Sequence, residues 1–304
     1  SSTLRETGET VSPMTASIIA IVTNFVLNYI LIFGKFGAPA LGITGAAIAT
    51  LTSRVLEFVI VAVYAPRYRR VPLMLRLLLR PGGAMARSFL KYATPVLVNE
   101  VLWGLGVSVM TAVMGHMAIS TDMLAAHAIM GNIDKFSTVA CFGIAGATAV
   151  IVGKRIGEGA GREEVYSLGC CLLTVSFGVG FVVSVCLAVL LPTVFIPYLY
   201  PLFHLEGLAL EIAVTMCVVY LFMLPLKAFD ITNITGLLRA GGDSRMASII
   251  DLSCQWVIAV PLVFNAPVAV VCLCIQSENV CKCPWGILRL RSRKWINDVT
   301  GEDT

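Results

Sequence analysis

Charged residues are scarce in this chain. They make up 13% of the 304 positions, whereas hydrophobic residues make up 58%, and the mean hydropathy is +0.87. A soluble domain typically has about 25% charged and about 45–50% apolar residues. So few charged side chains cannot cover a surface that faces water on all sides. The composition therefore excludes an ordinary soluble globular protein and predicts a membrane protein.

Several motifs that carry chemistry are also missing. The sequence has no G-x-x-x-x-G-K-[ST] phosphate-binding loop, paired-His metal motif, Ser/His dyad or Asp-rich phosphate motif. Most of the 10 cysteines lie in apolar runs, where cysteine behaves as a small hydrophobe, and the spacing of Cys281 and Cys283 is not that of a zinc site. We therefore expect no enzyme, no metal site and no cofactor, so that an ion gradient would have to drive any transport.

Long apolar runs are what the sequence does contain. A membrane-spanning helix needs about 20 apolar residues. Seven runs approach or exceed this length and a short eighth follows, at about 14–33, 42–65, 89–115, 123–153, 165–195, 208–236, 247–264 and 266–276. The predicted fold class is all-α, a polytopic bundle of membrane helices. Because residues 247–276 are too few for two full crossings, we expect a shortened or re-entrant final hairpin.

Arginine and lysine alternate between rich and poor loops along the chain. The segments 116–123 and 196–207 have none, whereas the loop after the second run carries Arg67, Arg69, Arg70, Arg76, Arg80, Arg87 and Lys91. Loops that face the cytoplasm are enriched in these residues. The alternation predicts eight crossings with both ends of the chain in the cytoplasm, a lipid bilayer as partner and no nucleic-acid partner. The polar start without Met suggests that the true N-terminus lies upstream.

An acidic residue at bilayer depth is the first candidate for a functional site. Glu100 lies near the middle of the run 89–115, beside Asn99 and after Pro95. A carboxylate in a medium of low dielectric constant binds a proton more readily and also attracts Na⁺ or an organic cation. Glu100 and Asn99 are therefore candidate cation- or substrate-binding residues. The alternative is a structural carboxylate that is hydrogen-bonded to a neighbouring helix.

A second acidic residue occupies a later apolar run. Asp230 and Asn233 are three positions apart, so a helix presents them on one face. Asp230 either joins the cation site or forms an ion pair with Lys227, which is also three positions away.

Asp134 and Lys135 lie near the centre of the fourth run and are further candidates. Because they are adjacent, they point about 100° apart on a helix and do not form a pair on one face. Lys135 could neutralise Glu100 from a facing helix when no cation is bound. It could equally pair with another carboxylate or face water.

Asp251, Arg239 and Pro95 are candidates for a structural or gating role. Asp251 lies near the start of its run, and a partner at Arg239 or Arg245 is favoured over a role in ion transport. Pro95 disturbs the helix that carries Glu100.

A series of motifs then resembles a known family. In order along the chain they include Pro95-x-x-x-Asn99-Glu100-x-x-Trp103, Leu238-Arg239-Ala240-Gly241-Gly242-Asp243, Asp251-x-x-x-x-Trp256 and Arg289-Leu-Arg291-Ser292-x-Lys294-Trp295-Ile296. The ordered set resembles the multidrug and toxic compound extrusion (MATE) family. The resemblance implies an N-terminally truncated chain, comprising helices five to twelve of a two-lobed, twelve-helix transporter that lacks helices one to four.

The resemblance also implies a domain organisation and a function. Residues 1–70 would be the last two helices of the N-terminal lobe, 71–90 a basic cytoplasmic linker, 91–276 a C-terminal lobe of six helices and 277–304 a basic cytoplasmic tail. The implied function is secondary active export of cationic or amphipathic drugs from the cell by antiport with Na⁺ or H⁺, with Glu100 at a cation-binding position. The alternatives are a flippase for lipid-linked precursors, which would favour a basic cavity, and a fragment that does not transport.

Overall fold

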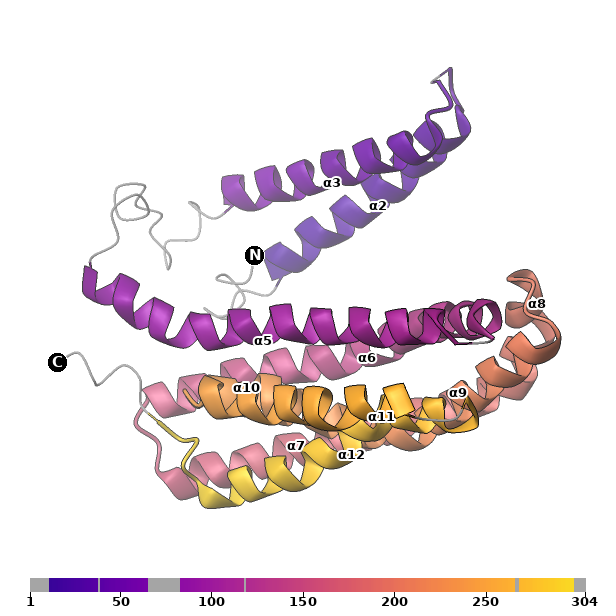
Figure 1. Ribbon diagram of the computed structural model, residues 1–304. Helices are drawn as coiled ribbons and strands as arrows, with labels where there is room; N and C mark the ends of the chain where they lie inside the picture. The colour runs from indigo at the N-terminus through magenta and orange to yellow at the C-terminus, as the bar shows by residue number, and fades with distance from the viewer. Residues whose placement is uncertain (1–10, 38, 65–82, 118, 266–267, 298–304) are drawn as a thin grey trace. The chain divides into compact units, whose positions relative to one another are not determined.

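The computed structural model describes residues 11–37, 39–64, 83–117, 119–265 and 268–297, and within these ranges it contains helices and turns without strands (Figure 1). The helical elements are α2 (Val11–Phe33), α3 (Gly42–Tyr64), α5 (Gly83–Gly115), α6 (Ser120–Gly157), α7 (Arg162–Leu190), η2 (Leu191–Leu199), α8 (Tyr200–Leu202), α9 (Gly207–Ile231), η3 (Thr232–Leu238), α10 (Ser244–Ser253), η4 (Cys254–Ala259), α11 (Val260–Asn265) and α12 (Val268–Ser292). Among the described residues, seven helices are long and apolar enough to cross a membrane. The predicted all-α membrane bundle is confirmed.

The chain divides into two compact units, residues 1–86 and 87–304. The boundary falls inside segment 71–90, which the sequence analysis interprets as a linker between lobes. Most of that segment, residues 71–82, lies outside the described residues.

The described part of the first unit is mainly a hairpin of α2 and α3. The two helices approach closely at Gly45, where an added Cβ would lie 2.6 Å from the carbonyl oxygen of Leu31. Polar side chains also join them, since Asn24 Nδ2 donates a hydrogen bond to Ser53 Oγ at 3.2 Å. Close backbone approach and interhelical hydrogen bonds hold membrane helices together where lipid removes the hydrophobic driving force.

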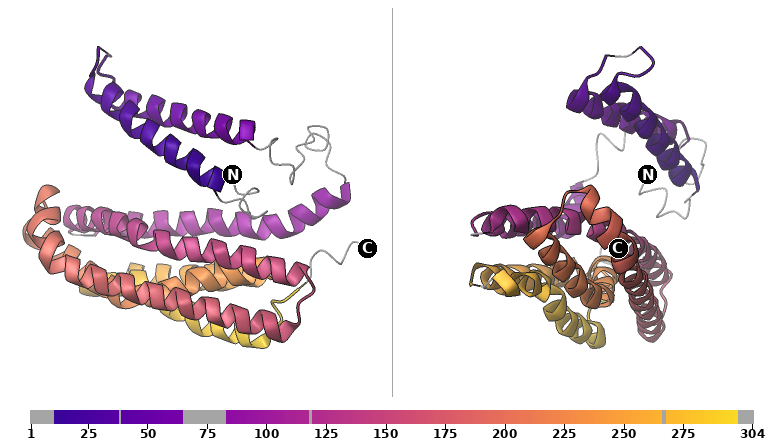
Figure 2. Two further views of the ribbon diagram at one scale, coloured as in Figure 1. Left: turned by 180° about the vertical axis from the view of Figure 1, so that it is seen from behind. Right: turned by 90° about the vertical axis from the view of Figure 1, so that its right-hand side faces the viewer.

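The second unit is a bundle in which α9 has the central place. Helix α9 contacts α6, α7 and α12, and Figure 2 shows the helices of this unit side by side. The approach to α7 depends on Gly180, because an added Cβ there would lie 2.5 Å from the Cβ of Ala228. The sequence places Gly178 two residues away, and an added Cβ there meets nothing within 4 Å. One glycine of the pair therefore permits close packing of α7 on α9.

Two wider π-helical segments interrupt the bundle beside predicted site residues. Segment η3 begins at Thr232, two residues after Asp230, and η4 begins at Cys254, three residues after Asp251. The π turn is rare in proteins and is frequently found at functional sites. Both segments lie where polar side chains gather inside the apolar bundle.

Helix α12 differs from the prediction for the end of the chain. The last apolar run is predicted to end at about residue 276, whereas helix α12 continues to Ser292. Hydropathy falls after Gln276 because the helix there carries Asn279 and Lys282, both of which are buried. These polar side chains pack inside the unit instead of facing water, and a count of apolar residues cannot detect that.

Candidate functional site

Asp230 is a buried carboxylate near the end of α9. Only 4% of its surface is exposed, and its Oδ1 atom accepts a hydrogen bond from the Cys283 thiol of α12, with Sγ 3.3 Å away. Its Oδ2 atom is buried and has no hydrogen-bond partner among the described residues. A buried polar group without a partner costs about 1–3 kcal/mol, and more when it is charged. A proton on this carboxyl group, or a cation beside it, would offset that cost.

Asn233 adds a second unpartnered group close to Asp230 in the sequence. It is fully buried at the start of η3, and neither Oδ1 nor Nδ2 has a hydrogen-bond partner among the described residues. Helix α12 passes against it at Gly286, where a Cβ would overlap the Asn233 amide. A buried amide with no partner is rare in proteins and calls for a functional explanation.

Asp251 forms an ion pair that joins α10 to α12. Its Oδ1 atom lies 2.7 Å from Lys282 Nζ, and its Oδ2 atom accepts a hydrogen bond from Asn99 Nδ2 of α5 at 2.9 Å. Lys282 also lies 3.2 Å from Glu278 Oε2, one helical turn earlier. The sequence analysis favours Arg239 or Arg245 as the partner of Asp251, whereas the structure pairs it with Lys282.

Glu100 is paired with Arg239. The Oε1 atom of Glu100 accepts a hydrogen bond from Arg239 Nη2 at 2.9 Å, and the Glu100 side chain is 57% exposed within its unit. Pro95, one turn earlier in α5, accepts a hydrogen bond from Ser248 Oγ at 3.1 Å through its carbonyl oxygen. The structure thus brings together two residues that the sequence analysis assigns to separate roles, one in cation binding and one in gating.

Asp134 and Lys135 point to different surroundings on α6. Asp134 Oδ1 lies 2.6 Å from Lys227 Nζ of α9, and the Lys227 ammonium also lies 5.5 Å from the centre of the Tyr220 ring. Lys135 is exposed within its unit and forms no ion pair with a described residue. Glu100 therefore has Arg239 as its partner instead of Lys135, and Lys227 pairs with Asp134 instead of Asp230.

Three residues of this polar region are not predicted as site residues from the sequence: Glu278, Lys282 and Cys283. They lie in the segment that the sequence analysis interprets as a cytoplasmic tail. The one local signal is the spacing of Glu278 and Lys282, which is four residues and suits an ion pair on a helix. Their contacts with Asp230 and Asp251 depend on the packing of α12, which no local pattern encodes.

Across the described residues, no three His, Cys, Asp or Glu side chains are arranged to hold a metal. Asp134 and Glu100 each have one basic partner, whereas Asp251 and Glu278 share the ammonium of Lys282.

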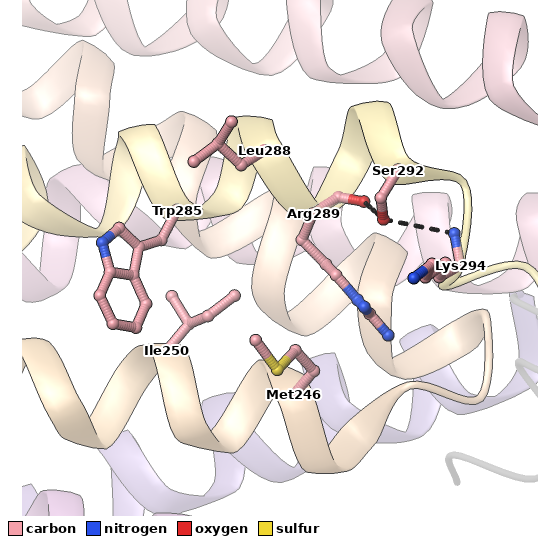
Figure 3. A pocket seen from close by; sticks show the side chains of 7 residues that line it. All are labelled: Met246, Ile250, Trp285, Leu288, Arg289, Ser292 and Lys294. Carbon is pink, nitrogen blue, oxygen red and sulfur yellow. Dashed lines mark hydrogen bonds between the residues drawn. The ribbon is translucent and has the colours of Figure 1, made fainter.

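A shallow pocket between α10 and α12 lies apart from these residues (Figure 3). The side chains that line it are Met246, Ile250, Trp285, Leu288, Arg289, Ser292 and Lys294. The charge of Arg289 is already matched there, because its Nε atom lies 2.5 Å from Asp243 Oδ2. The pocket contains none of the predicted site residues.

The comparison with known proteins identifies the family. Residues 95–264, more than half of the chain, match the MatE family. The chain belongs to the MATE family. It is thus part of a multi-pass membrane protein, and Glu100, Asp134, Asp230 and Asp251 all lie within the matched region.

Individual relatives agree with the family. A probable multidrug resistance protein NorM of Thermotoga maritima is 27% identical over 274 residues, which cover 87% of this chain and 55% of that protein. An uncharacterised transporter YisQ of Bacillus subtilis is 24% identical over 267 residues, which cover 87% of this chain and 56% of that protein. The chain thus spans about half the length of these curated MATE relatives.

Solved structures match the fold. A MATE protein in a bent conformation superposes with a TM-score of 0.78 at 20% identity, over 96% of this chain and 64% of that one. A transporter of the MOP superfamily from Pyrococcus furiosus gives a TM-score of 0.76 at 20% identity, over 92% of this chain and 63% of that one. These likenesses establish the MATE fold of the chain.

Proposed function

We propose that this chain takes part in secondary active export of organic cations, driven by the inward movement of Na⁺ or H⁺. The observation that carries the proposal is Asp230, a carboxylate buried in the apolar bundle with one oxygen atom unpartnered. A membrane-embedded carboxylate that lacks a counter-charge is stable only when it binds a proton or a cation. Because the coupling ion and the cationic substrate compete for one such group, binding of one releases the other.

The charges around Asp230 support its role over those of the other acidic residues. Glu100, Asp134 and Asp251 each have a basic partner within 3 Å, at Arg239, Lys227 and Lys282. Asp230 forms no ion pair with a described residue; its recorded partner is the neutral thiol of Cys283. Glu100 joins the site in this proposal, since its side chain is exposed within the unit and can exchange Arg239 for a substrate.

A flippase for lipid-linked precursors is the alternative function within the same superfamily. Its anionic substrate would require a cavity with an excess of basic groups. The buried region instead has an acidic excess, because Asp251 and Glu278 share the one ammonium of Lys282 and Asp230 is bonded to the neutral thiol of Cys283. The local charge therefore supports a cationic substrate.

The setting of the proposed transport is the plasma membrane. The alternation of arginine-rich and arginine-poor loops supports cytoplasmic positions for both ends of this chain. Residues 1–70 and 91–276 would then contribute to two lobes that alternate in access to the two sides of the membrane.

Gradient-driven efflux tests the proposal. The product of the complete gene that encodes this chain would be reconstituted into liposomes preloaded with ethidium, and an opposing Na⁺ or proton gradient would be imposed. We expect at least one of the two gradients to accelerate ethidium movement, and its collapse by an ionophore to abolish the acceleration. Movement at the same rate with and without either gradient would contradict coupled antiport.

A further inference from the structure

The Lys282 ammonium lies deep inside the second unit between two carboxylates. The residue is 5% exposed, and Nζ lies 2.7 Å from Asp251 Oδ1 and 3.2 Å from Glu278 Oε2. Burying an ammonium group away from water costs several kcal/mol unless carboxylates compensate for it. The two carboxylates together carry one negative charge more than the ammonium neutralises. The surroundings of Lys282 therefore stabilise a positive charge, and they carry more negative charge than the lysine neutralises.

Amide oxygens extend this acceptor surplus. Asn99 is 1% exposed and donates its Nδ2 to Asp251, while its Oδ1 atom has no hydrogen-bond partner. The donation to a carboxylate fixes which end of the amide is the oxygen, because the reverse assignment would place two acceptors together. An unpaired carbonyl oxygen beside a carboxylate is a ligand that a cation would use.

Gln255 repeats this pattern four residues after Asp251. It is 1% exposed, donates its Nε2 atom to the Trp103 carbonyl at 3.1 Å and leaves its Oε1 atom unpartnered. Since it forms its bond with a carbonyl oxygen, the orientation of its amide is fixed in the same way. Two buried amides, one on α5 and one on η4, thus each leave an acceptor unused.

We propose that Asp251, Glu278 and Asn99 form a binding site for a monovalent cation, either a primary alkylammonium ion or an alkali ion, and that the Lys282 ammonium fills this site as a tethered occupant. Removal of the lysine head group opens the site to a free cation of the same charge. This site does not include Asp230, although the Asp230 carboxyl group lies near enough to interact with the charges of Lys282, Glu278 and Asp251. Its use during transport rests on the proposed function, but its existence does not.

Chemical rescue of a shortened side chain tests the site. The product of the complete gene with Lys282→Ala would be purified in detergent, and its melting temperature measured in N-methylglucamine, sodium and n-propylammonium chloride at equal ionic strength. We expect propylammonium or sodium to raise the melting temperature of Lys282→Ala by about 2–4 °C, since a bound ligand stabilises the folded state. Wild-type protein should not respond, because Lys282 already fills the site.

Two further variants keep this test decisive. Lys154→Ala is the matched control, because Lys154 also pairs with a glutamate four residues away, Glu158, but has a side chain that is 74% exposed. It should show no cation-specific response. If Lys282→Ala alone is too unstable to purify, the double variant Lys282→Ala with Glu278→Gln replaces it in the test. The added Glu278→Gln removes one of the two carboxylates left without a positive charge and keeps Asp251 and Asn99 as cation ligands. A melting temperature that is the same in all three salts for the lysine-free protein would overturn the proposal.

The readout is independent of transport. Failure of coupled efflux would leave the rescue result intact, whereas absence of rescue would not affect the case for Asp230. A final variant, Lys282→Ala with Asp251→Asn and Glu278→Gln, removes both carboxylates and should lose the cation response. A response that persists in this variant would place the bound cation elsewhere and would also overturn the proposal.

Discussion

Replacement of Asp230 by asparagine is expected to reduce gradient-driven export by about ten- to hundredfold. Hydrogen bonds to a charged group contribute about 1.5–3 kcal/mol, and about 1.4 kcal/mol corresponds to a tenfold change in an equilibrium constant. Asparagine has nearly the same shape as aspartate and can still accept a hydrogen bond from Cys283, so the change removes mainly the negative charge. The initial rate of ethidium efflux from proteoliposomes measures the effect.

The control for Asp230→Asn lies in the same helix. Glu211 is also on α9 but is exposed, and Glu211→Gln removes one negative charge from the same element. We expect this variant to export at close to the wild-type rate. Both variants should be obtained in similar amounts, because neither alters apolar packing. Normal export by Asp230→Asn would remove the buried carboxylate from the mechanism.

Replacement of Glu100 by glutamine is expected to lower export by about ten- to hundredfold, since it removes a charge-assisted contact with the cation of about 1.5–3 kcal/mol. The carboxylate would meet the substrate when Arg239 releases it, and glutamine offers no charge in exchange. The measurement is ethidium efflux under sodium and proton gradients, each imposed separately. If Glu100→Gln exports normally under both gradients, Glu100 is not part of the cation path.

Arg239→Gln separates binding by Glu100 from a purely structural ion pair. The variant breaks the same 2.9 Å contact but leaves the Glu100 carboxylate free. If Glu100 binds cations, Arg239→Gln should retain or increase the affinity for ethidium, whereas Glu100→Gln should reduce it. Equal losses of affinity in the two variants would show that the residues act only as a structural pair.

Sequence reasoning recovers the spanning helices because their signal is local. A run of about 20 apolar residues is visible without any knowledge of packing, and each of the seven expected full-length runs overlaps one long helix in the described part of the chain. The last helix is the exception. Polar side chains on α12 are buried by contact with α9 and η4, so the apolar count falls where the helix continues.

The candidate site is only partly visible in the sequence for the same reason. Glu100 and Asp230 stand out because a charge inside an apolar run is unusual. Their partners cannot be read in the same way, since Glu100 meets Arg239 across 139 positions. Local spacing favours Lys227 for Asp230, yet Lys227 bonds to Asp134 across 93 positions. Such choices among nearby charges depend on helix packing and not on sequence distance.

The central claim is that one buried acidic region of this protein binds either a coupling cation or an organic cation. Equilibrium binding of labelled tetraphenylphosphonium to the purified product of the complete gene tests it most directly, with Na⁺ and proton concentrations varied separately. The account predicts that the apparent dissociation constant rises with one of these ions and that Asp230→Asn removes the dependence. Unchanged affinity at all Na⁺ and proton concentrations in the wild-type protein would contradict it.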